Sequence, residues 1–84
     1  MKVENILESI MDKTNTSKAQ LGRAVGIEDA KRPSDVISKR IKQKNISVNV
    51  LSEMLAAMGY TLAVVPNGTK LDEKKGEYEV TMGE

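Results

Sequence analysis

The sequence predicts a compact, mainly α-helical domain of about four helices, followed by a C-terminal β-strand or hairpin. Apolar residues recur at helical spacing as far as Gly59 and change to an alternating pattern after it, which indicates a change from helix to strand. Two of the helical segments follow a serine, a residue type that caps helices, and two end at a glycine. A chain of 84 residues is long enough for one domain with a modest core. We therefore expect a helical domain at residues 1–60 and a hairpin or tail at residues 61–84.

The first two helices are predicted from their apolar faces and their ends. Ser17 and Gln20 are spaced as a capping box, in which the serine oxygen accepts from a backbone N–H and the glutamine returns a bond. Gly26 is expected to end this second helix. The first helix, at about residues 3–13, is predicted because five apolar residues share one face: Val3, Ile6, Leu7, Ile10 and Met11.

The third and fourth helices begin at a proline and a serine. Pro33 disfavours helix at the residue before it and suits a first helical turn, so we expect the third helix at residues 33–43. Ser47 is expected to cap the fourth helix, which is apolar enough to be the central packing element. Met54 and Met58 are assigned to the core, although methionines also suit promiscuous binding surfaces.

Two alternating segments follow the fourth helix, separated by a polar loop from Pro66 to Gly76. A two-stranded hairpin is marginally stable by itself, so we expect a symmetric homodimer formed through residues 60–82. The alternative is that residues 67–84 form a disordered acidic tail. The apolar positions that alternate are Tyr60, Leu62 and Val64 in the first segment and Tyr78, Val80 and Met82 in the second.

The composition restricts the classes of function. The chain has no His and no Cys, which removes the usual general base, the thiolate nucleophile, the disulfide and the ordinary zinc site. We therefore expect no enzyme, no metal and no small-molecule cofactor. No apolar run approaches the roughly 20 residues of a membrane span, and the N-terminus lacks the pattern of a secretory signal. These features predict a cytoplasmic protein without a membrane partner. Two tyrosines are the only aromatic residues, which argues against RNA recognition by base stacking.

Positive charge is concentrated around the third helix. The whole chain has a net charge of +1, but residues 31–44 carry six cations and one carboxylate, a net charge of +5. Residues 67–84 carry three lysines and five carboxylates, a net charge of −2. In a helix, four polar residues of the third segment share one outward face: Asp35, Ser38, Lys39 and Lys42.

Such a face suits the major groove of DNA. Lysine bonds guanine acceptors there, serine serves as donor or acceptor, and neighbouring cations neutralise phosphates. Charge alone is equally compatible with the solvated face of a surface helix.

Three segments carry a resemblance to a known family because they occur in its order: residues 17–27, 36–41 and 47–59. Over residues 3–60 the chain resembles the phage-repressor-like helix-turn-helix DNA-binding family, the XRE family of Cro and lambda repressor. Ser17 stands at the family's capping position, Lys18 at that of a phosphate-contacting Gln, Leu21 at the core Leu and Gly26 at the turn Gly. The ending of the fourth helix, residues 53–60, is similar to that of short phage and mobile-element regulators. The resemblance implies a transcriptional regulator, a repressor, that binds a double-stranded DNA operator.

The resemblance also implies roles for individual residues of the third helix and its surroundings. Asp35 would either accept from a cytosine amino group or orient Lys39, or it would only cap the helix. The residues expected in the major groove are Ser34, Asp35, Ser38, Lys39 and Lys42. Those expected to hold phosphates are Lys18, Lys31, Arg32, Arg40 and Lys44.

Two features depart from the family pattern. The connection at residues 28–33 is several residues longer than the family's tight turn, which leaves the docking angle of the third helix open. Lys18 stands where the family has a Gln. A lysine can still contact a phosphate, but unlike a glutamine it cannot both donate and accept hydrogen bonds.

The second function compatible with the sequence is a protein-interaction module, such as an antitoxin or an inhibitor, and the acidic tail and near-neutral total charge suit it.

Overall fold

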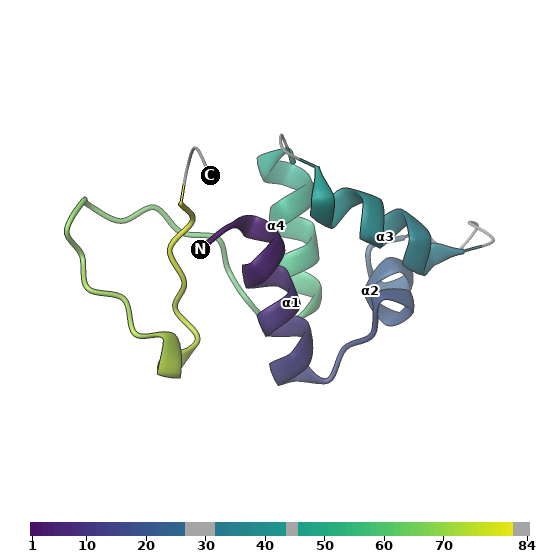
Figure 1. Cartoon of the computed structure of the whole chain (residues 1–84), viewed down its shortest axis with the longest axis horizontal. Helices are drawn as coiled ribbons and strands as arrows, with labels where there is room; N and C mark the ends of the chain where they lie inside the picture. The colour runs from purple at the N-terminus through teal and green to yellow at the C-terminus, as the bar shows by residue number, and fades with distance from the viewer. Residues whose placement is uncertain (27–31, 44–45, 82–84) are drawn as a thin grey trace.

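The computed structural model describes residues 1–26, 32–43 and 46–81. Within these ranges the chain forms four α-helices and one 3₁₀ turn (Figure 1). α1 and α4 form the middle of the molecule, α2 and α3 one end, and the extended chain after α4 the other. The predicted helical architecture is therefore confirmed. The elements are α1 (Val3–Thr14), α2 (Lys18–Ala24), α3 (Pro33–Lys42), α4 (Val48–Ala57) and η1 (Glu73–Lys75).

Serine caps begin two of the helices, as predicted. The Ser17 hydroxyl accepts a hydrogen bond from the Gln20 backbone N–H at 3.1 Å, and the Gln20 side chain accepts one from the Ser17 N–H at 2.8 Å. The Ser47 hydroxyl accepts from the Val50 N–H at 3.1 Å. These bonds satisfy backbone donors that the first turn of a helix leaves without a partner.

A glycine turn ends α4 and directs the chain away from it. Gly59 has a φ of +83°, and its N–H donates to the Ala56 carbonyl at 3.1 Å. The next N–H, that of Tyr60, reaches back to the Leu55 carbonyl at 2.8 Å. This pair of bonds is a Schellman motif, which favours glycine because of the positive φ.

All four helices contribute to one hydrophobic core. Met54 is fully buried and Met58 is 7% exposed, so both methionines belong to the core, as predicted. Three other core residues tie the helices together: Leu7 of α1, Leu21 of α2 and Ile37 of α3 are each at most 1% exposed. The complete set is Ile6, Leu7, Ile10, Met11, Leu21, Ile37, Ile41, Leu51, Met54, Leu55 and Met58.

The predicted C-terminal β-strand or hairpin is not found in the described part of the chain. Residues 60–81, called the C-terminal strap from here on, run out from α4 and back again with η1 at the bend (Figure 1). The returning half bonds the N-terminus instead of the outgoing half. The Met1 amino group donates to the Glu79 carbonyl at 2.8 Å, and the Thr81 N–H donates to the Met1 carbonyl at 2.9 Å. The alternating pattern therefore predicted a β-strand that the described residues do not form, since alternation does not specify which segment bonds the chain.

The strap is held to the helices by its aromatic and apolar residues. Tyr60, Leu62 and Tyr78 are half-buried against the core. The Lys13 ammonium of α1 lies 4.9 Å from the centre of the Tyr78 ring and donates to the Glu73 carbonyl at 3.1 Å. Up to residue 81, the segment that could have been a disordered tail therefore makes defined contacts. Residues 82–84 lie outside the described part.

None of the helices in the described ranges is both long and apolar enough to cross a membrane.

Candidate nucleic-acid interface

α3 is amphipathic and buries only one side. Ile37 is fully buried and Ile41 is 3% exposed, so these two residues anchor the helix in the core. α3 packs against α2, whose Leu21 and Gly22 are buried. The helix is 10 residues long, about 15 Å at the usual rise of 1.5 Å per residue. An α-helix with its side chains is about 10 to 12 Å in diameter, which matches the major groove of DNA, about 12 Å wide.

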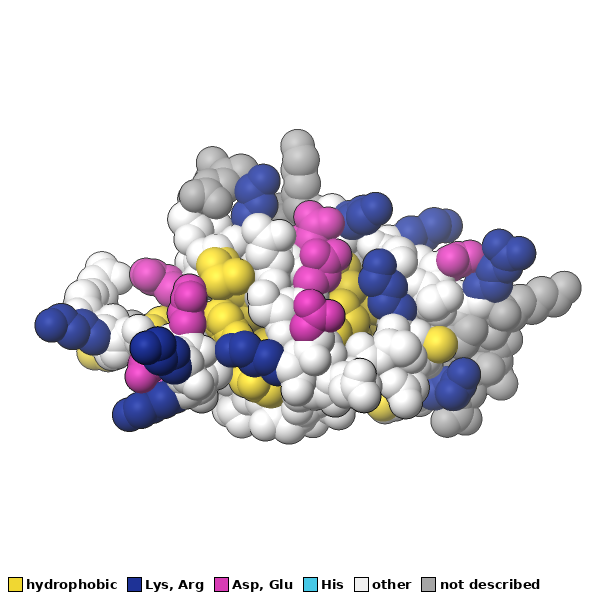
Figure 2. Space-filling view, turned by 60° about the horizontal axis from the view of Figure 1, so that its bottom comes forward, with side chains coloured by type: hydrophobic (Ala, Val, Ile, Leu, Met, Phe, Trp, Pro, Cys, Tyr) yellow, Lys and Arg dark blue, Asp and Glu magenta, His cyan; other side chains and the backbone are white. Residues whose placement is uncertain are grey.

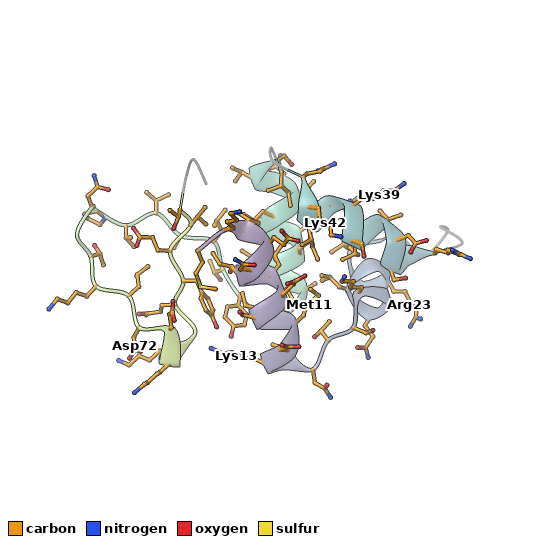
Figure 3. The ribbon with its side chains drawn as sticks, viewed as in Figure 1. Met11, Lys13, Arg23, Lys39, Lys42 and Asp72 are labelled. Atoms are coloured by element: carbon orange, nitrogen blue, oxygen red, sulfur yellow. The ribbon has the colours of Figure 1, made fainter. Side chains whose placement is uncertain are left out.

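The polar side of α3 faces solvent at three of its four predicted positions. Asp35, Lys39 and Lys42 are exposed, and Ser38 is half-buried. Figure 3 shows Lys39 at the α2–α3 end and Lys42 nearer the middle of the molecule, both away from Asp72 of the strap. The strap therefore leaves this face open.

Asp35 is paired with a neighbouring cation. The Arg32 guanidinium Nη1 lies 3.6 Å from the Asp35 carboxylate Oδ2, one turn away at the start of α3. A carboxylate in the first turn also interacts favourably with the helix dipole. Both side chains are exposed, at 81% and 59%, so the pair contributes little to stability, about 0 to 1 kcal/mol. Its local effect is to reduce the negative charge that Asp35 presents on an otherwise basic face.

The remaining predicted positions differ in burial, and two of them lie outside the described residues. Ser34, Arg40 and Lys18 are half-buried. Lys31 and Lys44, which were predicted to hold phosphates, lie outside the described residues, as does most of the 28–33 connection. The structure thus brings eight of the ten predicted residues to the α2–α3 end: Lys18, Arg32, Ser34, Asp35, Ser38, Lys39, Arg40 and Lys42.

One basic residue at this end was not predicted. Arg23 is exposed in the last turn of α2 (Figure 3). Arg23 lies two residues after the buried Leu21, which places it on the opposite side of a helix. Its exposure could therefore have been inferred from the helical period. It adds a cation at the end of the molecule that carries α3.

Charge is distributed unevenly over the surface. On the face drawn in Figure 2, the side chains at the end built by α2 and α3 are mainly Lys and Arg. Acidic side chains gather instead over the middle of the molecule and at the strap end, where they are mixed with lysines. A concentration of positive charge at one end attracts polyanions more strongly than the net charge of +1 suggests.

The described residues contain no group of three or more His, Cys, Asp or Glu side chains that could hold a metal ion. The chemistry that this surface offers is hydrogen bonding and charge neutralisation. Comparison of the chain with known protein families, with curated proteins and with solved structures finds no match.

Proposed function

We propose that the chain is a cytoplasmic transcriptional regulator, of the repressor type, that binds a double-stranded DNA operator through a lambda-repressor-like helix-turn-helix. The observation that carries the proposal is the placement of α3. Its apolar side is locked onto α2 and the core through Ile37 and Ile41, and its basic side is open to solvent. A recognition helix must be held in this way, with base-reading side chains outward and the scaffold behind it.

We assign two roles to the residues in and around α3. Lys39 and Lys42 are the exposed cations of the outward face and are proposed to bond guanine acceptors, with Ser34 and Ser38 as shorter partners beside them. The flanking cations are proposed to hold phosphates, which positions the helix without reading the sequence. They are Lys18, Arg32 and Arg40, together with Lys31 and Lys44 outside the described residues.

The Arg32–Asp35 pair gives Asp35 a defined part in this scheme. In the free protein, Arg32 offsets the carboxylate that would otherwise repel DNA. When a phosphate attracts Arg32, Asp35 becomes free to accept a hydrogen bond from a cytosine amino group. Reading a cytosine at one position would thus be coupled to a backbone contact beside it.

The test begins with selection of bound fragments from a random duplex pool, which reports sequence specificity and half-site spacing together. On the selected site, Lys39→Ala is expected to weaken binding by roughly 1 to 3 kcal/mol and to relax the preference at one position. Lys44→Ala should instead weaken binding to all duplexes alike and reduce the salt slope by about one unit.

Lys75→Ala is the matched control, because it removes the same charge from an exposed position on the strap. Fluorescence anisotropy of labelled duplexes gives all three affinities. Equal losses for Lys39→Ala and Lys75→Ala, without a change in sequence preference, would refute the proposed interface.

A protein-interaction module, such as an antitoxin or an inhibitor, is the second candidate, and one observation favours it. An apolar groove lies between the strap and the helices, and grooves of this kind bind partner segments. Salt separates the two functions, since binding to several phosphates weakens steeply between low and physiological salt, whereas binding in an apolar groove does not.

A further inference from the structure

The strap end carries an apolar groove that the DNA-binding proposal does not use. The groove has a volume of about 820 Å³ and lies between α1, α4 and the strap. Its lining includes the core residues Ile6, Ile10 and Leu55. Pockets that bind small molecules have volumes of about 300 to 1,000 Å³ and mainly apolar walls. The groove therefore has the size and the lining of a small-molecule site.

Exposed valines border this groove. Val64 is 100% exposed, Val48 67%, Val65 48% and Val80 40%, and all of them line the same opening. Single exposed apolar residues are ordinary on protein surfaces, whereas a contiguous group marks an interaction site. No other large hydrophobic residue of the described chain is exposed, so the exposed apolar surface is concentrated where a ligand would cover it.

The charged residues that line the groove are all acidic. Glu77 and Glu79 line it, and no Lys or Arg of the described chain does. Both glutamates are exposed, and neither forms an ion pair within the described chain. One carboxylate oxygen of Glu77 accepts from the Asp72 N–H at 3.0 Å, which holds this side chain beside the strap. A positively charged occupant would therefore be attracted here, and an anion would be repelled.

Both tyrosines also line the groove. Tyr60 and Tyr78 are the only aromatic residues of the chain, and the face of an aromatic ring attracts a cation within about 6 Å. Tyr78 already makes such a contact, because the Lys13 ammonium lies 4.9 Å from the centre of its ring, although Lys13 does not line the groove. Apolar walls, aromatic rings and carboxylates together suit an apolar molecule that carries a positive charge.

We propose that this groove binds a small hydrophobic cation, with the apolar body of the ligand against α1 and α4 and its charge near Glu77 and Glu79. Binding of this ligand goes beyond the proposed binding of an operator and does not depend on it. α2 and α3 form the opposite end of the molecule (Figure 1), so either function can fail without the other.

Isothermal titration calorimetry of the full chain with two probes of the same shape tests the proposal. Tetraphenylphosphonium and tetraphenylborate carry the same phenyl rings around opposite charges, so the difference between their affinities reports the preference for charge. The cation is expected to bind, and the anion should bind at least about tenfold more weakly. Tetramethylammonium has the positive charge without the apolar body and should not bind measurably.

A pair of variants tests the part played by the carboxylates. Glu79→Gln removes one of them and should weaken binding of tetraphenylphosphonium about two- to fivefold, the size of an exposed ion pair. Its affinity for tetraphenylborate should not fall. Glu53→Gln is the matched control, because it removes the same charge from an exposed residue of α4 that does not line the groove. Its affinity for both probes should equal that of the wild type.

Amide NMR shifts of the isotope-labelled wild type locate the bound probe without a variant. Tetraphenylphosphonium should shift amides of α1, α4 and the strap and leave those of α2 and α3 unchanged. The proposal is overturned if this cation does not bind, if it shifts amides outside the groove, or if both tetraphenyl probes bind equally well. Equal affinities of Glu79→Gln and Glu53→Gln for the cation would also overturn it. An amphipathic peptide that shifts the same amides where tetraphenylphosphonium does not would overturn it in favour of a protein partner.

Discussion

The two ends of the molecule are held in place in different ways. At the α2–α3 end, capped helices share a core, their backbone groups bond within the helices, and mainly charged side chains face solvent. At the strap end, residues 60–66 form neither helix nor strand, residues 61–65 make no backbone hydrogen bond within the described chain, and valines face solvent. The first end is complete by itself and offers charge to a partner. The second end offers apolar surface and a stretch of backbone without hydrogen bonds in the described chain.

The largest expected effect is on the free energy of unfolding, and it compares a core residue of α3 with a residue of the strap. Ile37→Ala should lower the free energy of unfolding by about 2 to 5 kcal/mol, because Ile37 is fully buried where α3 meets the core. Leu62→Ala, on the half-buried strap, should cost less, about 1 kcal/mol. Urea denaturation followed by circular dichroism measures both. An equal loss for the two variants would show that the strap is as integral to the fold as α3.

The next prediction concerns a close approach within the strap. Gly76 has a φ of +86°, and a Cβ at this position would lie 3.1 Å from the Tyr60 hydroxyl oxygen. Gly76→Ala should therefore destabilise the chain by about 1 kcal/mol or more, through backbone strain and displacement of the Tyr60 ring.

Gly68→Ala is its control, because Gly68 has nearly the same φ, +85°, and no atom within 4 Å of a Cβ. The difference between the two variants in urea denaturation isolates the contact with Tyr60. If both lose the same stability, the Gly76–Tyr60 approach does not hold the returning half of the strap.

The smallest expected effect is the pH dependence of the contact between Lys13 and the strap. The Tyr78 side chain beside Lys13, and to a smaller extent Tyr60 and Glu73, raise the pKa of the Lys13 ammonium above its usual value of 10.5. The ammonium lies over the ring, and the Tyr78 hydroxyl has no hydrogen-bond partner in the described chain, so we attribute the rise to the ring contact. A pKa raised by folding stabilises the fold below pH 10.5, and this contribution is lost as the pH rises through the folded value.

Lys13→Met tests this contribution. The wild type should be slightly more stable than the variant at neutral pH, and the difference should vanish in strongly alkaline solution. Lys75→Met serves as control because no ion pair or ring contact of Lys75 occurs in the described chain. A difference between wild type and Lys13→Met that is independent of pH would assign the effect to packing alone.

The helices could be predicted from the sequence because their signals are local. Ser17 and Gln20 lie within one turn of each other, and the bonds between them form in the structure as their spacing predicts. Ile37 and Ile41 stand one turn apart and are both buried. The exposure of Lys39 and Lys42 follows from the same period, so most of the candidate interface was also accessible from the sequence.

The arrangement of the strap could not be predicted, because it depends on contacts between distant residues. Alternation at residues 60–65 predicts extended backbone but does not specify which segment bonds it. The Met1 residue binds the returning half at Glu79 and Thr81, a contact between the two ends of the sequence that no local pattern encodes. The ion pair between Arg32 and Asp35 was not predicted, although their spacing of three residues allows it. Both residues had been assigned to DNA contacts instead.

The central claim is that the α3 end of the molecule, and not the strap end, binds duplex DNA. Titration of the isotope-labelled chain with its selected duplex, followed by amide NMR shifts, tests it most directly. The account predicts that the shifts concentrate in α2 and α3, with Lys39 and Lys42 among the largest, and that they decrease when salt is raised. Shifts confined to the strap and to the groove beside Val64, or no shift with any duplex, would contradict it.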